Sequence, residues 1–207
     1  MKQTEPRGRG LKKTGRPLSF DRDTALERAM LTFWRHGYET TSITDLTAAM
    51  GITTPSLYGA FGDKKRLFLE SVALYAGDLE ATAQAIAAAP SALDAARTLL
   101  MGAVITYTGE ATPPGCLLAS ATASGSPASS DVRQSVAGIR SFVASHLEQR
   151  IARDIASGVL PPHTDASALA GLVMTVMQGL SVMARDGMAR ASLQAIVATA
   201  LQAWPRR

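Results

Sequence analysis

Residues 41–61 read TSITDLTAAMGITTPSLYGAF. The first half of this stretch predicts a short helix, because its apolar residues recur at helical spacing and Ser42 can cap its N-terminus. Asp45 stands three residues after Ser42, as in a variant of the capping box. Gly51 is expected to end the helix after about two turns.

A second short helix is predicted directly after this glycine. Thr53 or Thr54 can cap it, and Pro55 is tolerated in its first turn. Leu57 and Phe61 lie four residues apart, so they share the inner face of the helix. Two short helices joined by a tight turn that contains glycine make a helix-turn-helix, which we assign to residues 42–61.

Further helical segments precede and follow this motif. The first is expected over Phe20–Gly37, and a long fourth helix is expected to be capped by Asp63 and to run to about Ala89. Breaks rich in Gly, Pro and Ser then separate five segments, at residues 91–108, 116–124, 129–157, 165–186 and 192–204. No run of alternating β-branched residues occurs. We therefore predict an all-α fold of about nine helices, with a three-helix helix-turn-helix domain followed by a helical bundle.

The excess positive charge lies in the first third of the chain. The 207 residues carry a net charge of +4. Met1–Arg66 holds twelve Lys and Arg against seven Asp and Glu, a net of +5, whereas Leu67–Arg207 holds nine against ten. This asymmetry is typical of a nucleic-acid-binding module joined to a second domain. Residues 1–18 mix basic residues with glycines and lack apolar periodicity, so we expect a flexible basic arm; the alternative is a solvated tail.

The residues present exclude or disfavour several kinds of site. Cys116 is the single cysteine, so neither an intrachain disulfide nor a Cys-based zinc site is possible. His36, His146 and His163 lack metal-ligand spacing, and we find no nucleotide-binding loop or nucleophile motif. We expect no metal and no cofactor, and an enzyme such as a Cys/His hydrolase is the disfavoured alternative. Without a secretory signal or an uninterrupted apolar stretch of ~20 residues, we expect a cytoplasmic protein with no membrane partner.

One dense pattern runs through the first third of the chain. It comprises Phe20-Asp21, Ala25-Leu26, Ala29, Phe33-Trp34, Gly37–Ile43, Asp45-Leu46, Met50–Ile52, Pro55–Tyr58, Phe61–Lys64 and Leu67-Phe68. This pattern resembles the N-terminal domain of the TetR family of bacterial transcription regulators, although Thr47 stands where the family usually has Ala. Beyond about Leu79 the resemblance is limited to helix number and length and to Gly115–Leu118. It implies a DNA-binding domain at residues 19–79 and an effector-binding and dimerisation domain at residues 80–207.

The second helix of such a motif enters the major groove of DNA, where base edges are distinguishable. Ser and Thr at helix N-termini can bind bases or phosphates, and the resemblance implies phosphate contacts for Tyr58 and Lys64. The alternatives are helix capping for the Ser and Thr residues and a solvated face for Lys64–Arg66. We predict DNA contacts at Arg16, Thr41, Ser42, Thr53, Thr54, Ser56, Tyr58 and Lys64.

In this family the helices that follow the DNA-binding domain enclose an effector cavity. The resemblance, and the methionines available on these helices, suggest a small, largely apolar ligand. We predict ligand contacts at Met101, Val104, Tyr107, Thr108, Leu118, Phe142, Met174, Met177 and Gln178, with plain core packing as the alternative for each. Cys116 follows Gly115 at a predicted helix N-terminus, so it is either a redox or electrophile sensor or an inert buried residue.

Apolar stripes on the last two predicted helices fit a dimer seam. The expected interface residues are Gly171, Leu180, Met183, Leu193, Val197 and Leu201, unless they pack only within one chain. Together these features predict a homodimeric repressor that binds a palindromic operator in double-stranded DNA and leaves it when a small effector binds. The alternative is an activator or an architectural DNA-binding protein without a ligand.

Overall fold

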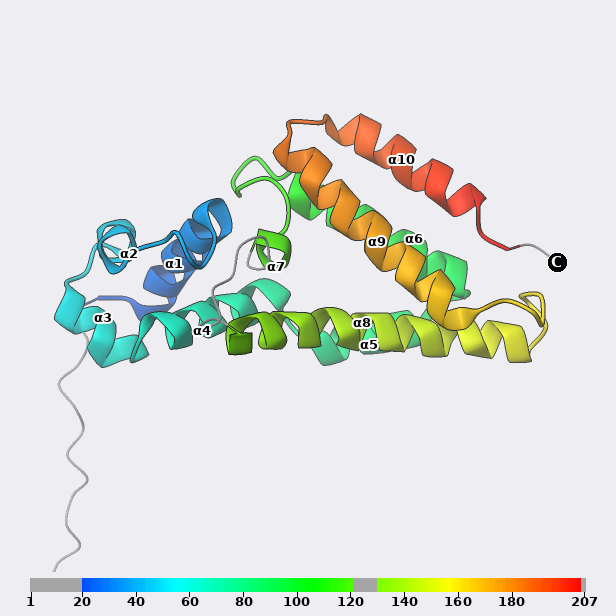
Figure 1. Cartoon of the computed structure of the whole chain (residues 1–207), viewed down its shortest axis with the longest axis horizontal. Helices are drawn as coiled ribbons and strands as arrows, with labels where there is room; N and C mark the ends of the chain where they lie inside the picture. The colour runs from blue at the N-terminus through cyan, green and yellow to red at the C-terminus, as the bar shows by residue number, and fades with distance from the viewer. Residues whose placement is uncertain (1–19, 121–129, 206–207) are drawn as a thin grey trace, which may run out of the picture.

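The computed structural model describes residues 20–120 and 130–205, which form helices and no strands. In chain order the helices are α1 (Arg22–His36), α2 (Ile43–Met50), α3 (Thr54–Phe61), α4 (Lys64–Ala76), α5 (Leu79–Ala88), α6 (Ala92–Tyr107), α7 (Leu117–Ser120), α8 (Ser130–Ala156), α9 (Ala166–Arg185) and α10 (Arg190–Gln202). Helices α1–α3 lie together at one end, and α4 leads from them alongside α8 (Figure 1). Helix α9 packs on α6 and α8, and α10 packs on α6 and α9.

Local hydrogen bonds set the ends of the N-terminal helices. The Asp45 amide donates to the Ser42 hydroxyl, and the Asp45 carboxylate accepts from the Ser42 amide, which confirms the capping box of α2. Gly51 ends α2 in the left-handed conformation, with φ 69°. Thr53 caps α3 by accepting from the Ser56 amide, and Asp63 caps α4 by accepting from the Arg66 amide. The helix-turn-helix is therefore specified by contacts that span three or four residues.

The expected long fourth helix is two helices, so that prediction is wrong. Helix α4 ends at Ala76, because Gly77 takes φ 64° and ψ −151°, a conformation outside the helical region. Asp78 then caps α5 by accepting a hydrogen bond of 3.0 Å from the Ala81 amide. A glycine stop and a new cap outweigh the high helix propensity of the Ala-rich segment that follows.

The remaining helices agree with their predicted positions to within a few residues. The segment predicted at 116–124 forms the four-residue helix α7 within the described part of the chain; its last four residues lie outside that part. The described ranges thus contain ten helices instead of about nine, because the fourth is divided.

Aromatic side chains join the first helix to the fourth. The rings of Phe33 and Phe68 meet edge to face with centroids 5.0 Å apart, and the rings of Trp34 and Tyr75 do so at 4.8 Å. Phe33, Trp34 and Phe68 are buried in a core that continues into the bundle. Contacts of this kind each add about 0.5–1.5 kcal/mol beyond area burial, so α1 and α4 are expected to move together.

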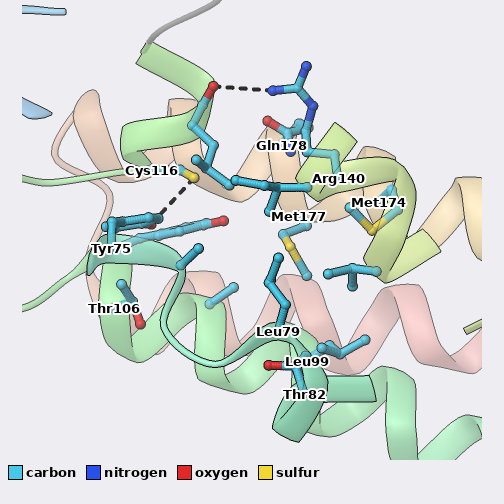
Figure 2. Close-up of a pocket in the computed structure, with 16 residues that line it drawn as sticks. Tyr75, Leu79, Thr82, Leu99, Thr106, Cys116, Arg140, Met174, Met177 and Gln178 are labelled. Carbon is cyan, nitrogen blue, oxygen red and sulfur yellow. Dashed lines mark hydrogen bonds between the residues drawn. The ribbon is translucent and has the colours of Figure 1, made fainter. Parts of the chain in front are cut away.

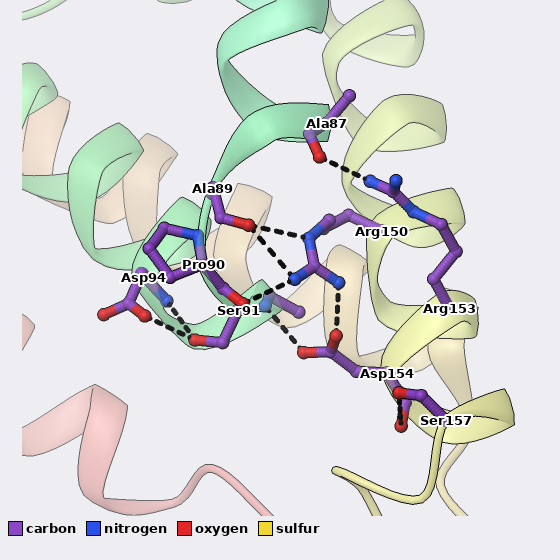
Figure 3. Close-up of polar contacts among 10 residues, drawn as sticks. Ala87, Ala89, Pro90, Ser91, Asp94, Arg150, Arg153, Asp154 and Ser157 are labelled. Carbon is purple, nitrogen blue, oxygen red and sulfur yellow. Dashed lines mark hydrogen bonds and ion pairs between the residues drawn. The ribbon is translucent and has the colours of Figure 1, made fainter.

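A buried ion pair fixes the junction between α5 and α6 (Figure 3). Arg150 on α8 pairs with Asp154 one turn later and donates to the backbone carbonyls of Ala89 and Pro90 at 2.9–3.3 Å. The Asp154 carboxylate accepts from the Ala92 amide at 2.7 Å. This one ion pair therefore supplies hydrogen-bond partners to carbonyls at the end of α5 and to an amide at the start of α6, which have no partner within their own helices.

Candidate DNA-binding surface and effector cavity

Helix α3 carries the surface predicted to read bases. Thr54 is exposed, and Tyr58 is 48% exposed, so both side chains are available to a partner. Thr53 and Ser56 are engaged with each other, since their hydroxyl oxygens lie 2.9 Å apart and the Thr53 hydroxyl caps the helix. For these two residues capping is therefore observed, and DNA contact stays a prediction. Ser56 is half-buried, which leaves Thr54 and Tyr58 as the freer candidates.

The two residues predicted at the start of α2 differ in exposure. Ser42 is exposed, although its hydroxyl donates to the Asp45 carboxylate at 2.7 Å. Thr41 is 2% exposed, and its hydroxyl donates to the Gly37 carbonyl at 2.6 Å. The structure therefore corrects the prediction for the Thr41 hydroxyl, which closes the preceding turn and does not reach the surface. Thr44, an exposed residue in the same first turn, is available instead and was not predicted.

Lys64 lies at the start of α4 and is drawn toward the domain. Its ammonium sits 4.6 Å from the centre of the Tyr38 ring and donates to the Glu39 carbonyl at 3.3 Å. Burial lowers the pKa of the Lys64 amine, and the Glu39 charge opposes that shift. An ammonium has three donors, so a phosphate contact by Lys64 stays a prediction. Arg16, the eighth predicted DNA contact, lies outside the described residues.

A cavity of about 270 Å³ lies between α4, α5, α6, α7, α8 and α9 (Figure 2). Five of the nine predicted ligand residues line it: Tyr107, Leu118, Met174, Met177 and Gln178. The rest of the lining is Tyr75, Ala76, Leu79, Thr82, Leu99, Ala103, Thr106, Cys116, Ile139, Arg140 and Val143. Contact of any of these residues with a ligand stays a prediction.

Four predicted ligand residues do not line this cavity, so their assignment to it is corrected. Val104 is fully buried in the core, and Met101 packs against the core from the side. Thr108 accepts a hydrogen bond of 2.7 Å from Arg190. Phe142 stacks on His146 with ring centroids 4.3 Å apart. Helical spacing alone did not distinguish neighbouring faces of α6 and α8.

Tyr75 and Arg140 are cavity residues that the sequence-based prediction missed. Tyr75 lies in the last turn of α4, which ends at Ala76. Arg140 offered a signal, since it lies four residues after Val136 and three before Val143 on the otherwise apolar face of α8. A cation in an apolar stripe is a candidate for a functional role.

A hydrogen-bonded joint connects the cavity wall to α1 of the N-terminal domain. The Trp34 indole N–H donates to the Gly115 carbonyl at 3.1 Å, and the Cys116 amide donates to the Ser181 hydroxyl at 2.8 Å. Arg185 on α9 donates to the carbonyls of Trp34 and Cys116. Gly115 has φ +79°, and a Cβ there would lie 2.7–2.8 Å from Arg185 and from the Ser181 carbonyl, so only glycine fits.

Two tyrosines converge on Cys116 at this joint. The Tyr75 hydroxyl donates to the Cys116 sulfur at 3.4 Å, and the thiol is 4% exposed. Burial raises the pKa of the Tyr75 and Tyr107 phenols, and the neighbouring Cys116 thiol raises both further. Both phenols are therefore neutral hydrogen-bond donors near pH 7.

The structure corrects the predicted dimer seam at three of its six residues, and for the other three the interface stays a prediction. Leu180, Leu193 and Val197 are at most 1% exposed within one chain, so they form its own core. Gly171 is exposed, and Met183 and Leu201 are half-buried. The apolar side chains that do face outward on α9 and α10 are Leu172, Val182 and Ile196, which are 38–50% exposed.

Helix α9 is the one described helix whose length and composition would allow it to cross a membrane. Its most apolar 18-residue window has a mean hydropathy of 1.6, yet only 28% of that window is buried in the chain. Polar residues such as Thr175 and Gln178 interrupt it, so it differs from the uninterrupted apolar stretch sought in the sequence. Neither a membrane span nor burial within one chain therefore explains why the outer face of α9 is apolar.

Comparison with known proteins places the chain among bacterial regulators. The family model described as "Bacterial regulatory proteins, tetR family" matches residues 25–71, and "Tetracyclin repressor-like, C-terminal domain" matches residues 92–202. The HTH-type transcriptional repressor ComR of Escherichia coli (strain K12) is 35% identical over 196 residues, which cover 94% of this chain and 93% of ComR. The chain belongs to the TetR family. Members are DNA-binding transcription regulators, so this chain is a regulator and not an enzyme.

Solved structures of TetR-family proteins have the same fold. A cysteine mutant of the regulator CifR, complexed with 26-bp double-strand operator DNA, is 43% identical with a TM-score of 0.85 and covers 92% of this chain and 100% of its own. A putative TetR regulator from Rhodococcus sp. RHA1 is 38% identical with a TM-score of 0.59, covering 89% of this chain and 100% of its own. The all-α fold with an N-terminal helix-turn-helix is thereby confirmed.

Proposed function

We propose that this TetR-family chain is a homodimeric repressor that binds a palindromic operator through α3 and leaves it when a small ligand fills the cavity. It would act in the cytoplasm, where bacterial DNA lies. One set of contacts carries the proposal. Tyr75 and Cys116 line the cavity; the Tyr75 ring contacts the Trp34 ring of α1, and Gly115, the residue before Cys116, accepts a hydrogen bond from the Trp34 indole.

These contacts supply a physical route between the two sites. A ligand that displaces the Tyr75 ring must also disturb its edge-to-face contact with Trp34 and its bond to Cys116. Because α1 and α4 share a close-packed core, a shift at Trp34 moves the helix-turn-helix as a unit. In a dimer that movement changes the distance between the two α3 helices, and the affinity for DNA falls.

Recognition by a single α3 helix is modest, which favours a dimer. Thr54 and Tyr58 can hydrogen-bond bases or phosphates, but neither offers the bidentate contact that Arg or Asn makes. Two symmetric copies double the contacts and require a palindromic site. ComR is named a repressor, and the CifR mutant was solved in complex with operator DNA. Both findings support a repressor role for the present chain.

The outer face of α9 and α10 is the proposed dimer interface. Leu172, Val182 and Ile196 give it apolar contacts, and Gly171 and Gly179 leave open space for a close approach. A second copy packed there would account for an α9 that is apolar yet little buried in one chain. The helices then form a four-helix seam, two from each copy.

We keep the proposed division of the chain into an arm at residues 1–18, a DNA-binding domain at 19–79 and a ligand-binding and dimerisation domain at 80–207. The helix break at Gly77 and Asp78 supports the second boundary, and the two family models match on either side of it.

Selection of bound DNA from a random pool tests this function. The expected result is an inverted repeat, and Thr54→Ala should relax preference at one base pair of each half-site by about 1 kcal/mol, since the contact is not bidentate. Thr98→Ala, at an exposed threonine on α6, is the matched control and should leave the preference unchanged. Recovery of no preferred sequence, or of one without symmetry, would contradict the proposal.

A further inference from the structure

The cavity holds one charge. Arg140 on α8 is the single charged side chain among its lining residues, and neither Asp nor Glu lines it within the described ranges. The remaining lining is apolar or carries neutral hydroxyl, thiol and amide groups. Arg140 is half-buried there, and a half-buried cation is stabilised by an anion that binds beside it.

The guanidinium of Arg140 is positioned but not paired. One of its N–H groups donates to the Leu118 carbonyl at 3.2 Å, which holds the side chain across the end of the cavity. None of the four ion pairs found among the described residues includes it. A guanidinium has five N–H donors in a planar fork, so donors remain for a bidentate contact with a carboxylate.

Gln178 on α9 stands beside Arg140 at the same end of the cavity (Figure 2). Its side chain makes no hydrogen bond within the part of the chain that the structure describes, so its amide can donate to the same partner. Leu79 and Leu99 lie at the opposite end, with Met174 and Met177 between the two ends (Figure 2). The cavity is therefore polarised, with a cation and an amide at one end and, apart from the hydroxyl of Thr82, aliphatic side chains at the other (Figure 2).

The cavity volume limits the size of a ligand. This volume of about 270 Å³ lies just below the usual range of about 300–1,000 Å³ for ligand pockets. The cavity therefore suits a small ligand, such as a carboxylate with a phenyl ring or a short alkyl chain.

We propose that the ligand of this cavity is a small monocarboxylate with an apolar body, its carboxylate held by Arg140 and Gln178 and its body packed on Leu79, Leu99 and the two methionines. The proposal rests on the proposed function, in which this cavity is the effector site. A neutral or cationic ligand of the same shape would leave the half-buried guanidinium without a counter-charge, so the site discriminates by charge.

Calorimetric titration with matched probes tests the proposal. Benzoate and hexanoate are compared with benzamide and hexanamide and with benzylamine and hexylamine, using the full chain. We expect each acid to bind about tenfold or more tightly than its amide, because charge-assisted hydrogen bonds are about twice as strong as neutral ones. Arg140→Gln should abolish that preference while its circular dichroism and melting temperature stay near those of the parent.

Two further variants keep the result interpretable. Arg153→Gln removes an exposed arginine from the same helix and should leave the preference intact. Gln178→Leu should weaken acid binding relative to the parent. If the Arg140 variant fails to fold, this result decides the question, and acid binding at the parental affinity in Gln178→Leu would overturn the proposal. Amides or amines that bind as tightly as the acids, no acid binding at about 10 mM, or full acid preference in folded Arg140→Gln would each overturn the proposal.

Binding of the selected operator is measured on the same ligand-free samples. A chain that binds no DNA would contradict the proposed function, whereas the acid preference is decided by calorimetry alone. Acids that bind with the expected preference but leave operator affinity unchanged would support the ligand class and refute release by ligand.

Discussion

Arg150→Met is expected to lower the free energy of unfolding by about 3–5 kcal/mol, the usual cost of removing one partner from a buried ion pair. Methionine fills most of the volume of the arginine stem, so little of the loss comes from a cavity. The side chain of Asp154 is only 6% exposed and would lose its cation, while the Ala89 and Pro90 carbonyls would lose their donors. Of the bonds that this pair makes to the junction between α5 and α6, the Asp154 bond to the Ala92 amide would then remain.

Urea denaturation followed by circular dichroism measures this change as a shift in midpoint. Arg153→Met is the matched control, since its exposed guanidinium donates to the Ala87 carbonyl at 2.7 Å (Figure 3), and it should cost less than about 1 kcal/mol. Arg150→Met combined with Asp154→Leu should recover part of the loss, because no unpaired carboxylate then stays buried. An Arg150→Met variant as stable as the control would refute the reasoning.

Three further outcomes are expected. Removal of residues 1–16 deletes six basic residues and one acid, so DNA affinity should fall and the slope of log affinity against log salt should become shallower; an unchanged slope would show that this segment does not contact DNA. Val182→Asp should give a folded monomer in sedimentation, because Val182 is 50% exposed, whereas Val197→Asp should unfold the chain, because Val197 is 1% exposed; a dimeric Val182→Asp protein would place the interface elsewhere. The pKa values of buried Tyr75 and Tyr107 are raised, so the folded chain keeps protons that the unfolded chain loses near pH 10. The free energy of unfolding should therefore fall as the pH rises above about 10, and it should fall less steeply in Tyr75→Phe. Urea midpoints that do not change with pH in this range would contradict this expectation.

The helix-turn-helix could be predicted from sequence because its determinants are local. The Ser42 and Asp45 capping box, the left-handed Gly51 and the Thr53 cap each involve residues within four positions of one another. The prediction for the Thr41 hydroxyl was wrong because this group donates to the Gly37 carbonyl four residues earlier, which keeps it away from the surface. This contact is as local as the helix caps, but it was not considered.

The cavity and the joint could not be predicted in the same way, because they depend on contacts between distant segments. Trp34 meets Gly115 across 81 residues, and nothing near Trp34 specifies that partner. The dimer-interface prediction was wrong at several residues for a related reason. Apolar stripes on α9 and α10 predict that these faces are buried, but not by which chain. Leu193 and Val197 are buried by their own chain, and the apolar residues that face outward lie on adjacent faces of the same helices.

Operator affinity of Ala103→Phe tests the control of DNA binding by the cavity most directly, because it fills the cavity without any ligand. Ala103 lines the cavity from α6, and a phenyl ring there would occupy the space assigned to the effector. Gly102→Ala, on the same helix with open space around its added Cβ, is the control. The account predicts that Ala103→Phe stays folded and dimeric but binds the selected operator about 5–150-fold more weakly, the usual range of allosteric coupling. A folded, dimeric Ala103→Phe protein that no longer binds benzoate but binds the operator as tightly as the parent would contradict the account.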